Sequence, residues 1–582
     1  MEYFYKERIG VPDLFTGRQN ELAYFQQWIE DIKKEKSKST AILARRKMGK
    51  TALLERLFNI TFYKNNHVIP FYFEVLEVDY WVVDFCIDFF FTFIYQYMAF
   101  KSRKSEYLNP VEKSHFGKLK AMVQKEGLDY LTDLIDSVEN MVQEERLDVL
   151  WTTVRNAPKT IAARQNEYIV QMIDEFQFLN DKVFWDKEKK NVAKNLAAGY
   201  LSTAESKIAP LLVTGSWVGW LMNLLKQMLP SRFIYTYLES MPEEEAIEMI
   251  FKYSQYFDVP ITDETAFLIA QVSEGSPFYI SSILRSQYKS RELTSAEGLA
   301  KTLEFETLDN RGEIKYTWME YVNSAFDQIN NKNAKRIVLY LCKHRDQEIT
   351  RAELLEQLQL DMTDGELELK LEALIKADII LQGSTNYDYQ GVKDNIFDKV
   401  FRGVYQKEIE AFDLKQIKEE YLATIENLKK QHYQLLGKFN YMKGYFAEYR
   451  ILDQLLFHGQ EKNVLLKSIT RNLPADFDFC PYQSVWRYNA TIEYGSALSV
   501  DILARAKAPG FYSIIGEVKN RDTKKFSKDE VVAFLDKFAK IKEKENLSPV
   551  IGFIFSRKGF TKDALAYCLE KGVATSSDEQ WL

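Results

Sequence analysis

A loop of small and basic residues near the N-terminus has the composition of a phosphate-binding loop. Gly49-Lys50-Thr51 follows the apolar run Ala41–Leu43 and opens an amphipathic helix. Main-chain N–H groups of such a loop, with the positive end of the helix, hold phosphate oxygens. We expect Lys50 to reach the β- and γ-phosphates and Thr51 to offer a hydroxyl to Mg²⁺. The other loop positions expected to contact the nucleotide are Arg46, Lys47, Met48, Gly49 and Ala52.

This loop departs from the pattern G-x-x-x-x-G-K-[ST] at one position. Ala44 stands where the first glycine is expected, which puts the sharpness of the first turn in question. The alternative interpretation is a basic loop that precedes a helix by chance. A phosphate site also needs carboxylates on a neighbouring strand, so the rest of the chain decides between the two.

Two adjacent acids end the apolar segment Tyr168–Gln177. Asp174 is expected to hold Mg²⁺ through its water shell, and Glu175 to orient and deprotonate the attacking water. Adjacent acids after an apolar run are common by chance. Their position downstream of a phosphate loop favours the functional interpretation.

A second group of chemically useful residues lies near the C-terminus. Residues 498–505 and 511–519 predict a β-hairpin around a turn at 508–510. Glu517 and Lys519 are two positions apart and so share one face, and Asp501 can lie opposite them. We expect Asp501 and Glu517 to bind Mg²⁺ and Lys519 to position or activate water, as phosphodiester hydrolysis requires. Glu-x-Lys alone is uninformative, because it occurs by chance in most proteins of this size.

The bulk composition is that of a folded protein with two to four domains. The chain has 582 residues, of which 46% are hydrophobic and 28% charged. Its formal net charge of −7 gives no overall basic field, so any nucleic-acid contact must come from a local patch. The four cysteines lie far apart without a C-x-x-C pair, which indicates neither a zinc site nor a disulfide framework and fits a reducing cytosol.

One segment, Tyr80–Phe100, is apolar enough to raise the question of a membrane span. Asp84 and Asp88 lie inside it, and each would cost about 2.5–3.5 kcal/mol at a bilayer centre. A buried core helix with its aspartates at the exposed edge is the cheaper explanation. The N-terminus shows no basic region followed by an apolar one, so no signal peptide is expected and we predict a cytoplasmic protein.

Two further segments frame the phosphate loop and the acids: Phe15-x-Gly17-Arg18-x-x-Glu21-Leu22 before them and Glu274-Gly-Ser-Pro277-Phe278 after them. In this order, over residues 12–290, the motifs resemble the archaeal-type ATPases of the STAND branch of AAA-like P-loop NTPases. The resemblance implies bound ATP and Mg²⁺, with Arg18 beside the adenine and Pro277 against the base. It also implies that Ser216, or Thr214, faces the γ-phosphate or the attacking water.

The arginine that completes phosphoryl transfer is left open by the sequence. Arg232 is one candidate, and an arginine from a neighbouring subunit is the other. The second choice would make the protein a homo-oligomer.

The elements around the C-terminal hairpin are a helix at 443–450 that carries Glu448, a helix at 529–542 and a strand at 549–556. Together with Asp501 and Glu517-x-Lys519, this arrangement resembles the PD-(D/E)xK, or restriction-endonuclease-like, nucleases. The resemblance implies a DNA substrate, Mg²⁺ or Mn²⁺ as the metal, and Glu448 as a further member of the site. Val500 stands in place of the proline of the family motif. The expected phosphate-facing patch consists of Lys519, Arg521, Lys524, Lys525, Lys528 and Lys537.

The middle of the chain resembles a winged-helix module. Its third helix, at 363–376, would enter the DNA major groove, but it carries four acids against two lysines, which phosphates repel. A regulatory or structural role is therefore expected. After it, Leu414, Tyr421, Leu428 and Leu435 recur every seven residues and predict an amphipathic connecting helix packed on a neighbour.

The sequence as a whole predicts an α/β multidomain protein in which strands alternate with helices around a parallel sheet. The expected domains are an ATPase core (1–235), a helical lid (236–325), a winged helix (326–405), a connecting helix (406–436) and an α/β nuclease-like domain (437–582). The expected function is an ATPase that regulates a metal-dependent DNA endonuclease in defence against foreign DNA. The alternative is a nucleotide-switched scaffold that binds nucleic acid without cleaving it. Expected partners are DNA, ATP, further copies of the chain and a trigger protein or nucleic acid.

Overall fold

The computed structural model describes residues 4–65, 67–108, 115–215, 218–327, 331–385, 387–410, 413–489 and 498–582. The chain forms two compact units, Met1–Lys429 and Lys430–Leu582. Each unit has its own five-stranded sheet and its own hydrophobic core clusters.

A five-stranded parallel sheet lies at the centre of the first unit. Its strand order is β2-β4-β6-β1-β7. The bounds are Thr40–Leu43 (β1), Val68–Glu74 (β2), Tyr168–Asp174 (β4), Leu211–Gly215 (β6) and Ile234–Tyr237 (β7). The three central strands are buried on both faces, which explains their nearly continuous apolar sequences.

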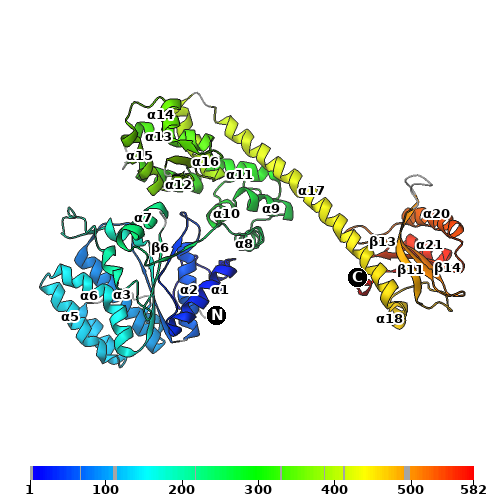
Figure 1. Ribbon diagram of the computed structural model, residues 1–582, viewed down its shortest axis with the longest axis horizontal. Helices are drawn as coiled ribbons and strands as arrows, with labels where there is room; N and C mark the ends of the chain where they lie inside the picture. The colour runs from blue at the N-terminus through cyan, green and yellow to red at the C-terminus, as the bar shows by residue number, and fades with distance from the viewer. Residues whose placement is uncertain are drawn as a thin grey trace. The chain divides into compact units, whose positions relative to one another are not determined.

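Helices cover both faces of this sheet (Figure 1). Their bounds are Gln19–Glu30 (α1), Lys50–Lys64 (α2), Val82–Ser102 (α3), Phe116–Lys125 (α4), Thr132–Gln143 (α5), Leu147–Gln165 (α6) and Val218–Met228 (α7). A small pair of strands, Tyr80–Trp81 (β3) and Val183–Phe184 (β5), lies beside α3. Short 3-10 helices of the first unit occupy Pro12–Leu14, Asp31–Lys34, Ser105–Tyr107, Asp129–Leu131, Phe176–Asn180 and Ala197–Leu201, and one in the second unit occupies Glu579–Trp581.

The apolar helix α3 is a core helix. It is long and apolar enough to cross a membrane, but 78% of its apolar window is buried inside the protein. Phe85 and Phe89 pack on β2 and against Trp151 of α6, and Asp84 is exposed. The helix is buried, as expected; of the two aspartates expected at its exposed edge, Asp84 is exposed and Asp88 is half-buried.

A helical region follows the sheet. Its helices are Glu243–Tyr256 (α8), Asp263–Val272 (α9), Pro277–Leu284 (α10), Ala296–Leu308 (α11) and Glu313–Asp327 (α12). Pro277 occupies the first turn of α10, where its missing N–H costs nothing. Gly275 before it has φ +67°, and a Cβ there would lie 2.2 Å from the carbonyl oxygen of Met241. Only glycine fits this close turn.

The next region is a small helical subdomain with a three-stranded antiparallel sheet of order β8-β10-β9. Its elements are Asn331–Lys343 (α13), Ile349–Thr350 (β8), Arg351–Gln357 (α14), Asp364–Lys376 (α15), Ile380–Gln382 (β9), Asp388–Gly391 (β10) and Asn395–Ile409 (α16). Thr350 with Glu353, and Thr363 with Glu366, form the capping boxes that start α14 and α15. Two acids of α15, Asp364 and Glu368, pair with Arg351 of α14.

The long helix α17 runs from Lys415 to Asp453 without a break. It begins later and ends later than the connecting segment expected at 406–436, because the helix continues through Gly437 and Gly444 as far as the π-helical turn Gln454–His458. In the first unit Ile417, Tyr421 and Ile425 are buried, and Tyr421 donates a hydrogen bond to Thr307 of α11. This part therefore packs on a neighbour, as expected.

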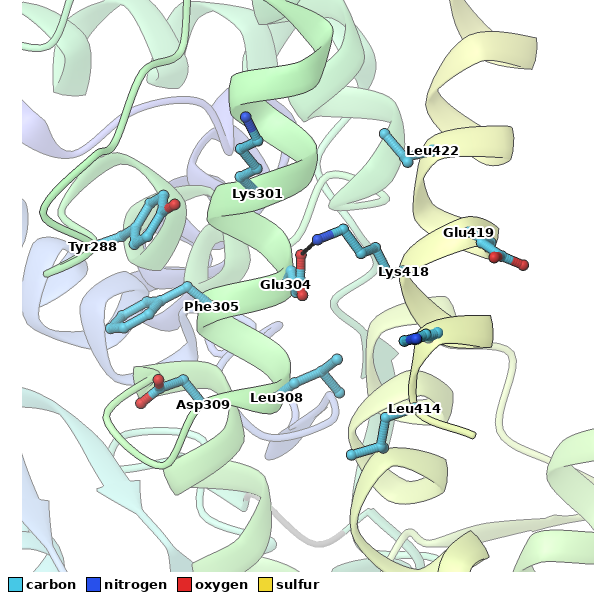
Figure 2. A pocket seen from close by; sticks show the side chains of 11 residues that line it. Tyr288, Lys301, Glu304, Phe305, Leu308, Asp309, Leu414, Lys418, Glu419 and Leu422 are labelled. Carbon is cyan, nitrogen blue, oxygen red and sulfur yellow. Dashed lines mark ion pairs between the residues drawn. The ribbon is translucent and has the colours of Figure 1, made fainter. Parts of the chain in front are cut away.

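A groove of about 950 Å³ lies between α11 and the start of α17 (Figure 2). Lys418 pairs with Glu304 across it at 3.0 Å. The phosphate loop does not line this groove. Its size alone therefore does not make it the site of chemistry.

The second unit contains a mixed five-stranded sheet of order β11-β12-β13-β14-β15. The strands are Tyr482–Asn489 (β11), Ser499–Ala506 (β12), Ser513–Lys519 (β13), Val550–Ser556 (β14) and Val573–Ser576 (β15). The first three are antiparallel and the last three parallel. Helices Lys528–Lys544 (α20) and Lys562–Lys571 (α21) pack on one face, and the end of α17 with Trp581 packs on the other; Asn463–Ser468 (α18) follows α17.

Candidate functional sites

The phosphate loop connects β1 to α2. Its left-handed positions are Lys47 (φ +65°) and Gly49 (φ +86°), and Ala44 is not one of them. A Cβ is therefore tolerated at the position where the motif expects its first glycine. Lys50 is buried and spans the loop, because its Nζ donates to the carbonyl oxygens of Ala44 (2.7 Å) and Arg45 (2.9 Å). Burial lowers the Lys50 pKa, against the opposing pull of Glu175 and Asp174.

Asp174 ends β4 as a fully buried carboxylate that several donors converge on. The hydroxyl of Thr51 donates to Oδ2 at 2.6 Å, the hydroxyl of Thr214 donates to Oδ1, and the Glu175 amide donates to Oδ1 at 3.0 Å. Burial and the adjacent Glu175 raise the Asp174 pKa. Thr214 and Glu175 lie at the carboxyl ends of β6 and β4, and Thr51 lies in the first turn of α2, after the loop that follows β1. This is the edge where parallel sheets bind ligands.

Glu175 adopts a left-handed backbone conformation (φ +55°) immediately after β4. The Gln177 side chain donates to its Oε2 at 2.6 Å. Glu175 lines the pocket next to the phosphate loop, whereas the buried Asp174 does not line it.

This pocket holds about 510 Å³, within the range of small-molecule sites. Apolar side chains from α8 and α10 line one part of it, and cations line another part together with the acids Glu74, Glu77 and Glu175. The apolar residues are Met249, Tyr253, Pro277 and Phe278; the cations are Arg8, Arg46, Lys47, Lys50 and Arg285. Aromatic and apolar surface beside a cationic loop suits a ligand with a flat base and a phosphate tail.

The arginines of the loop also tie it to later parts of the first unit. Arg45 pairs with Asp394, the N-cap residue of α16, at 3.1 Å and lies over the Trp318 ring. Arg46 lies 4.8 Å over the Tyr321 ring and pairs with Glu77. The loop is thus held by α12 and α16 as well as by the sheet.

The second site lies at the end of the hairpin in the other unit. Lys519 Nζ lies 2.7 Å from Glu517 Oε1 and 3.4 Å from Asp501 Oδ2, and that oxygen also accepts the Val518 amide at 2.9 Å. Val518 points into the core, so Glu517 and Lys519 share the opposite face as expected. Burial alone would lower the Lys519 pKa, but Asp501 and Glu517 raise it above its usual value.

Glu448 reaches this site from α17. Burial, and then the charge of Asp501, raise its pKa to about 7. Arg487 of β11 lies 3.6 Å from it, and Lys537 of α20 lies 3.8 Å from Glu517. The strands and two helices therefore bring three acids and three cations together.

Two carboxylates of this site have an oxygen that could bind a divalent cation. Glu517 Oε2 and Glu448 Oε2 are buried and accept no hydrogen bond, so each has an oxygen available as a ligand. Among the described residues, no group of three or more His, Cys, Asp or Glu side chains is close enough to hold a metal by itself. A cation at this site would therefore be completed by water or by substrate oxygens.

No protein-family model matches this chain, and no curated protein matches it. Among solved structures, it is similar to a Walker-type ATPase of Pyrococcus abyssi, at 13% identity and TM-score 0.43 over 69% of this chain and 100% of that one. It is also similar to the RuvB Holliday junction branch migration motor of Thermotoga maritima (12%, 0.31, 71% and 100%) and to the ORC2 protein of Aeropyrum pernix (12%, 0.35, 70% and 99%). These likenesses are too low to transfer an activity.

The structure places most of the predicted nucleotide contacts in one pocket. Those that line it are Arg46, Lys47, Gly49, Lys50, Thr51, Ala52, Glu175 and Pro277. Arg18 and Met48 lie outside it: the buried Arg18 guanidinium donates to the carbonyl oxygens of Met48 and Glu239, so it braces the loop. Ser216 lies outside the described residues, and Thr214, the alternative weighed with it, contacts Asp174.

Arg232 cannot complete this site from within its own chain. It lies two residues before β7, at the amino ends of the parallel strands, whereas the phosphate loop follows β1 at the carboxyl ends. Its guanidinium pairs with Glu205. A parallel strand separates its two ends by its whole length, so the candidate from the same subunit is wrong.

Among the pocket residues that the sequence analysis did not assign to the site are Arg8, Tyr253 and Arg285. Arg8 pairs with Glu74 at the end of β2, and Arg285 pairs with Glu313. Arg285 does have a local signal, because it follows Pro277 by two helical turns and so returns to the same side of α10. Arg8 and Tyr253 have none, since packing alone brings them to the loop.

Proposed function

We propose that the first unit binds and hydrolyses ATP. The observation that carries this proposal is the 2.6 Å hydrogen bond from Thr51 to Asp174, which joins the phosphate loop to the acidic strand end. In phosphoryl-transfer sites this pair holds Mg²⁺, which neutralises charge on the phosphates when it is bound. Lys50 and the loop amides would hold the phosphates, and Glu175 would take a proton from the attacking water.

The pocket wall supports a nucleoside triphosphate over a free polyphosphate. Tyr253 and Phe278 offer aromatic surface for a base, and Pro277 lines the same pocket. Burial lowers the Lys50 pKa, and the charge of a bound phosphate would raise it again.

We infer a second activity, metal-dependent hydrolysis of DNA, for the second unit. Lys519 between Asp501 and Glu517 supports it, because two carboxylates can hold a cation while the lysine stabilises charge on the reacting phosphate. Glu448, with a pKa of about 7, can exchange a proton with water near neutral pH. A cation at this site would lower the pKa of bound water.

The two activities would be coupled through residues 326–405, proposed as a winged helix with a regulatory role. Its contact with the phosphate loop, Asp394 with Arg45, would let the nucleotide alter its packing. The acids on α15 pair with Arg351 and do not suit a phosphate backbone. In the cell such a nucleotide-controlled nuclease would act in the cytoplasm on foreign or mobile DNA.

The deciding experiment measures cleavage of plasmid and linear DNA with Mg²⁺ or Mn²⁺, with and without ATP. Wild type is compared with Asp501→Ala and with Asp536→Ala, which removes an exposed acid of α20. We expect metal-dependent cleavage that Asp501→Ala abolishes and Asp536→Ala retains. Equal cleavage by all three proteins would indicate a contaminating nuclease.

The competing function is a nucleotide-switched scaffold that binds nucleic acid. Absence of cleavage under every condition, with DNA binding retained, would establish it. The ATPase is tested separately with Lys50→Ala, which should lose nucleotide affinity, and Glu175→Gln, which should bind ATP but not turn it over. If both variants matched wild type in affinity and turnover, the ATPase proposal would be wrong.

A further inference from the structure

The second unit exposes a row of large apolar side chains along α17. Leu435, Phe439, Met442, Phe446 and Tyr449 are between 56% and 68% exposed. Isolated exposed apolar residues are ordinary, but five on one stretch of helix form a contiguous patch of the kind that marks an interface. We call these five residues the α17 stripe.

The spacing of the α17 stripe is that of a helix that packs on another helix. Successive members are four, three, four and three residues apart, which is the heptad pattern of a coiled-coil seam. The opposite side of the same helix buries Ala447, Ile451 and Leu455 in the core of the second unit. The α17 stripe is therefore not needed to hold the helix on its own sheet.

The same seven-residue register runs back into the first unit. There Tyr421 and Ile425, which precede Leu435 by fourteen and ten residues, are only 2% exposed. Helices cover them, since Tyr421 bonds to Thr307 of α11 and the ammonium of Lys399 of α16 lies over its ring. One continuous stripe is thus covered by helices at its start and exposed from Leu435 onward.

We propose that a second copy of this chain covers the α17 stripe, with the α17 helices of the two copies packed against each other. A side chain of this size has on the order of 200 Å² of surface, so five that are about 60% exposed offer about 600 Å² per copy. Pairing would bury about 1,200 Å² in total, the lower limit for a specific interface. A self-complementary surface of this kind closes into a two-fold dimer.

The charges beside the stripe favour this partner over an anionic one. Lys443 pairs with Asp522, and Arg450 donates to the main-chain carbonyl of Leu582. These cations are already engaged within the second unit, so they offer little to nucleic acid or to an anionic membrane. The dimer is independent of the proposed catalytic activities, because no stripe residue belongs to either site.

Light scattering coupled to size-exclusion chromatography of the full chain, at micromolar concentrations, tests this proposal. We expect wild type to be a dimer and Met442→Glu or Phe446→Lys to be monomers, with at least a roughly tenfold weaker association. Tyr433→Glu is the control: this aromatic is 54% exposed on the opposite side of the same helix and should leave the dimer intact. The far-UV circular dichroism spectrum should be the same for all variants, since these side chains are exposed within one copy of the chain and are not needed for its fold.

A second measurement locates the interface. The four native cysteines are buried, so Met442→Cys with a short bismaleimide should give a cross-linked dimer and Tyr433→Cys should not. A monomeric wild type would overturn the proposal and indicate that another part of the chain or another protein covers the stripe. A dimer that persists in both charged variants would overturn it as well, because the interface would then lie elsewhere.

Discussion

Arg45 in the phosphate loop lies 3.1 Å from Asp394 at the start of α16, although 349 residues separate them in the sequence. The same Asp394 oxygen accepts the Tyr279 hydroxyl at 2.8 Å, and that hydroxyl accepts the Trp318 indole N–H at 2.9 Å. The loop, α10, α12 and α16 therefore meet at one carboxylate. A movement of the phosphate loop must therefore break the contacts of the Asp394 carboxylate or move this residue together with the loop.

Asp394→Asn should weaken the first unit and loosen its hold on nucleotide. The neutral side chain leaves Arg45, which is largely enclosed, without its counter-charge, so we expect about 2–3 kcal/mol of lost stability. Urea unfolding of both single variants and of Arg45→Gln/Asp394→Asn gives the coupling energy. If the two single variants lose stability additively in this double-mutant cycle, the Arg45–Asp394 ion pair has no coupling energy. Stopped-flow release of a fluorescent ADP should be faster in Asp394→Asn.

Thr51→Val should reduce ATP turnover by roughly 100-fold and raise the Mg²⁺ concentration needed for half-maximal activity. The change removes the hydroxyl that bonds to Asp174, whereas Thr51→Ser keeps it and should stay within a few-fold of wild type. Thr61→Val is the control, because its hydroxyl bonds only to the Leu57 carbonyl of the same helix. Steady-state phosphate release at varied Mg²⁺ measures all four proteins. A Thr51→Val enzyme with normal Mg²⁺ dependence would contradict the assignment.

Lys519→Gln should slow DNA cleavage by at least about 100-fold while DNA affinity changes little. Its ammonium bridges two carboxylates, so its role is local to the reacting phosphate. Lys537→Gln should have a smaller effect, since Lys537 lies 3.8 Å from Glu517 alone. Single-turnover cleavage and fluorescence anisotropy separate rate from binding. Equal losses of affinity and rate in Lys519→Gln would instead assign this lysine to binding.

Asp378 should make folding stability depend on pH. It accepts the Val218 and Gly219 amides at the start of α7, yet burial raises its pKa to about 6. The folded state then binds this proton more tightly than the unfolded chain. The stabilisation is complete below pH 4 and is lost as the pH rises through 6.

The Asp378→Asn variant has no titratable group at this position. Its free energy of unfolding relative to that of wild type should therefore rise by about 3 kcal/mol between pH 4 and pH 7. Urea unfolding of both proteins across this range measures the change. The test is how the stability difference between the two proteins changes with pH. Its size at a single pH is not informative, because it also contains the effect of the altered hydrogen bonds. A pH-independent difference between the two proteins would refute the assignment.

Gly275→Ala should destabilise the first unit by about 2 kcal/mol or more. The added methyl group would meet the Met241 carbonyl at 2.2 Å, and the left-handed backbone strains any non-glycine residue. Gly127→Ala is a matched control with φ +72° and nothing within 4 Å of the added Cβ, so it reports the backbone cost alone. Thermal unfolding of both variants should show the larger loss at Gly275. Equal losses of stability in the two variants would mean that the backbone at Met241 shifts to accept the methyl group at no cost in free energy.

Much of the local structure follows from the sequence because its signals are short-range. The strand at 68–74, the capped helices that begin at Arg351 and Asp364, and the hairpin that carries Asp501 and Glu517 lie where period and capping residues place them. Alternation along a strand also fixes that Glu517 and Lys519 share a face. These features depend on neighbours within a few residues, which the sequence shows directly.

Contacts between residues far apart in the sequence could not be predicted from these short-range signals. No pattern within the sequence joins Arg8 or Tyr253 to the phosphate loop, or Asp394 to Arg45, because packing of distant helices makes those contacts. Arg232 illustrates the same limit: its residue type suited catalysis, but the direction of β7 places it at the wrong edge of the sheet.

The sequence by itself determined which residues are able to bind phosphates and metals, and that the strands of the first unit would be parallel. The tertiary structure decided that Thr51, Asp174 and Thr214 meet, that Arg18 braces the loop from outside the pocket, and that the α17 stripe is exposed. The physical reason is that residue type and period act locally, whereas strand order and helix packing depend on the free energy of the whole core.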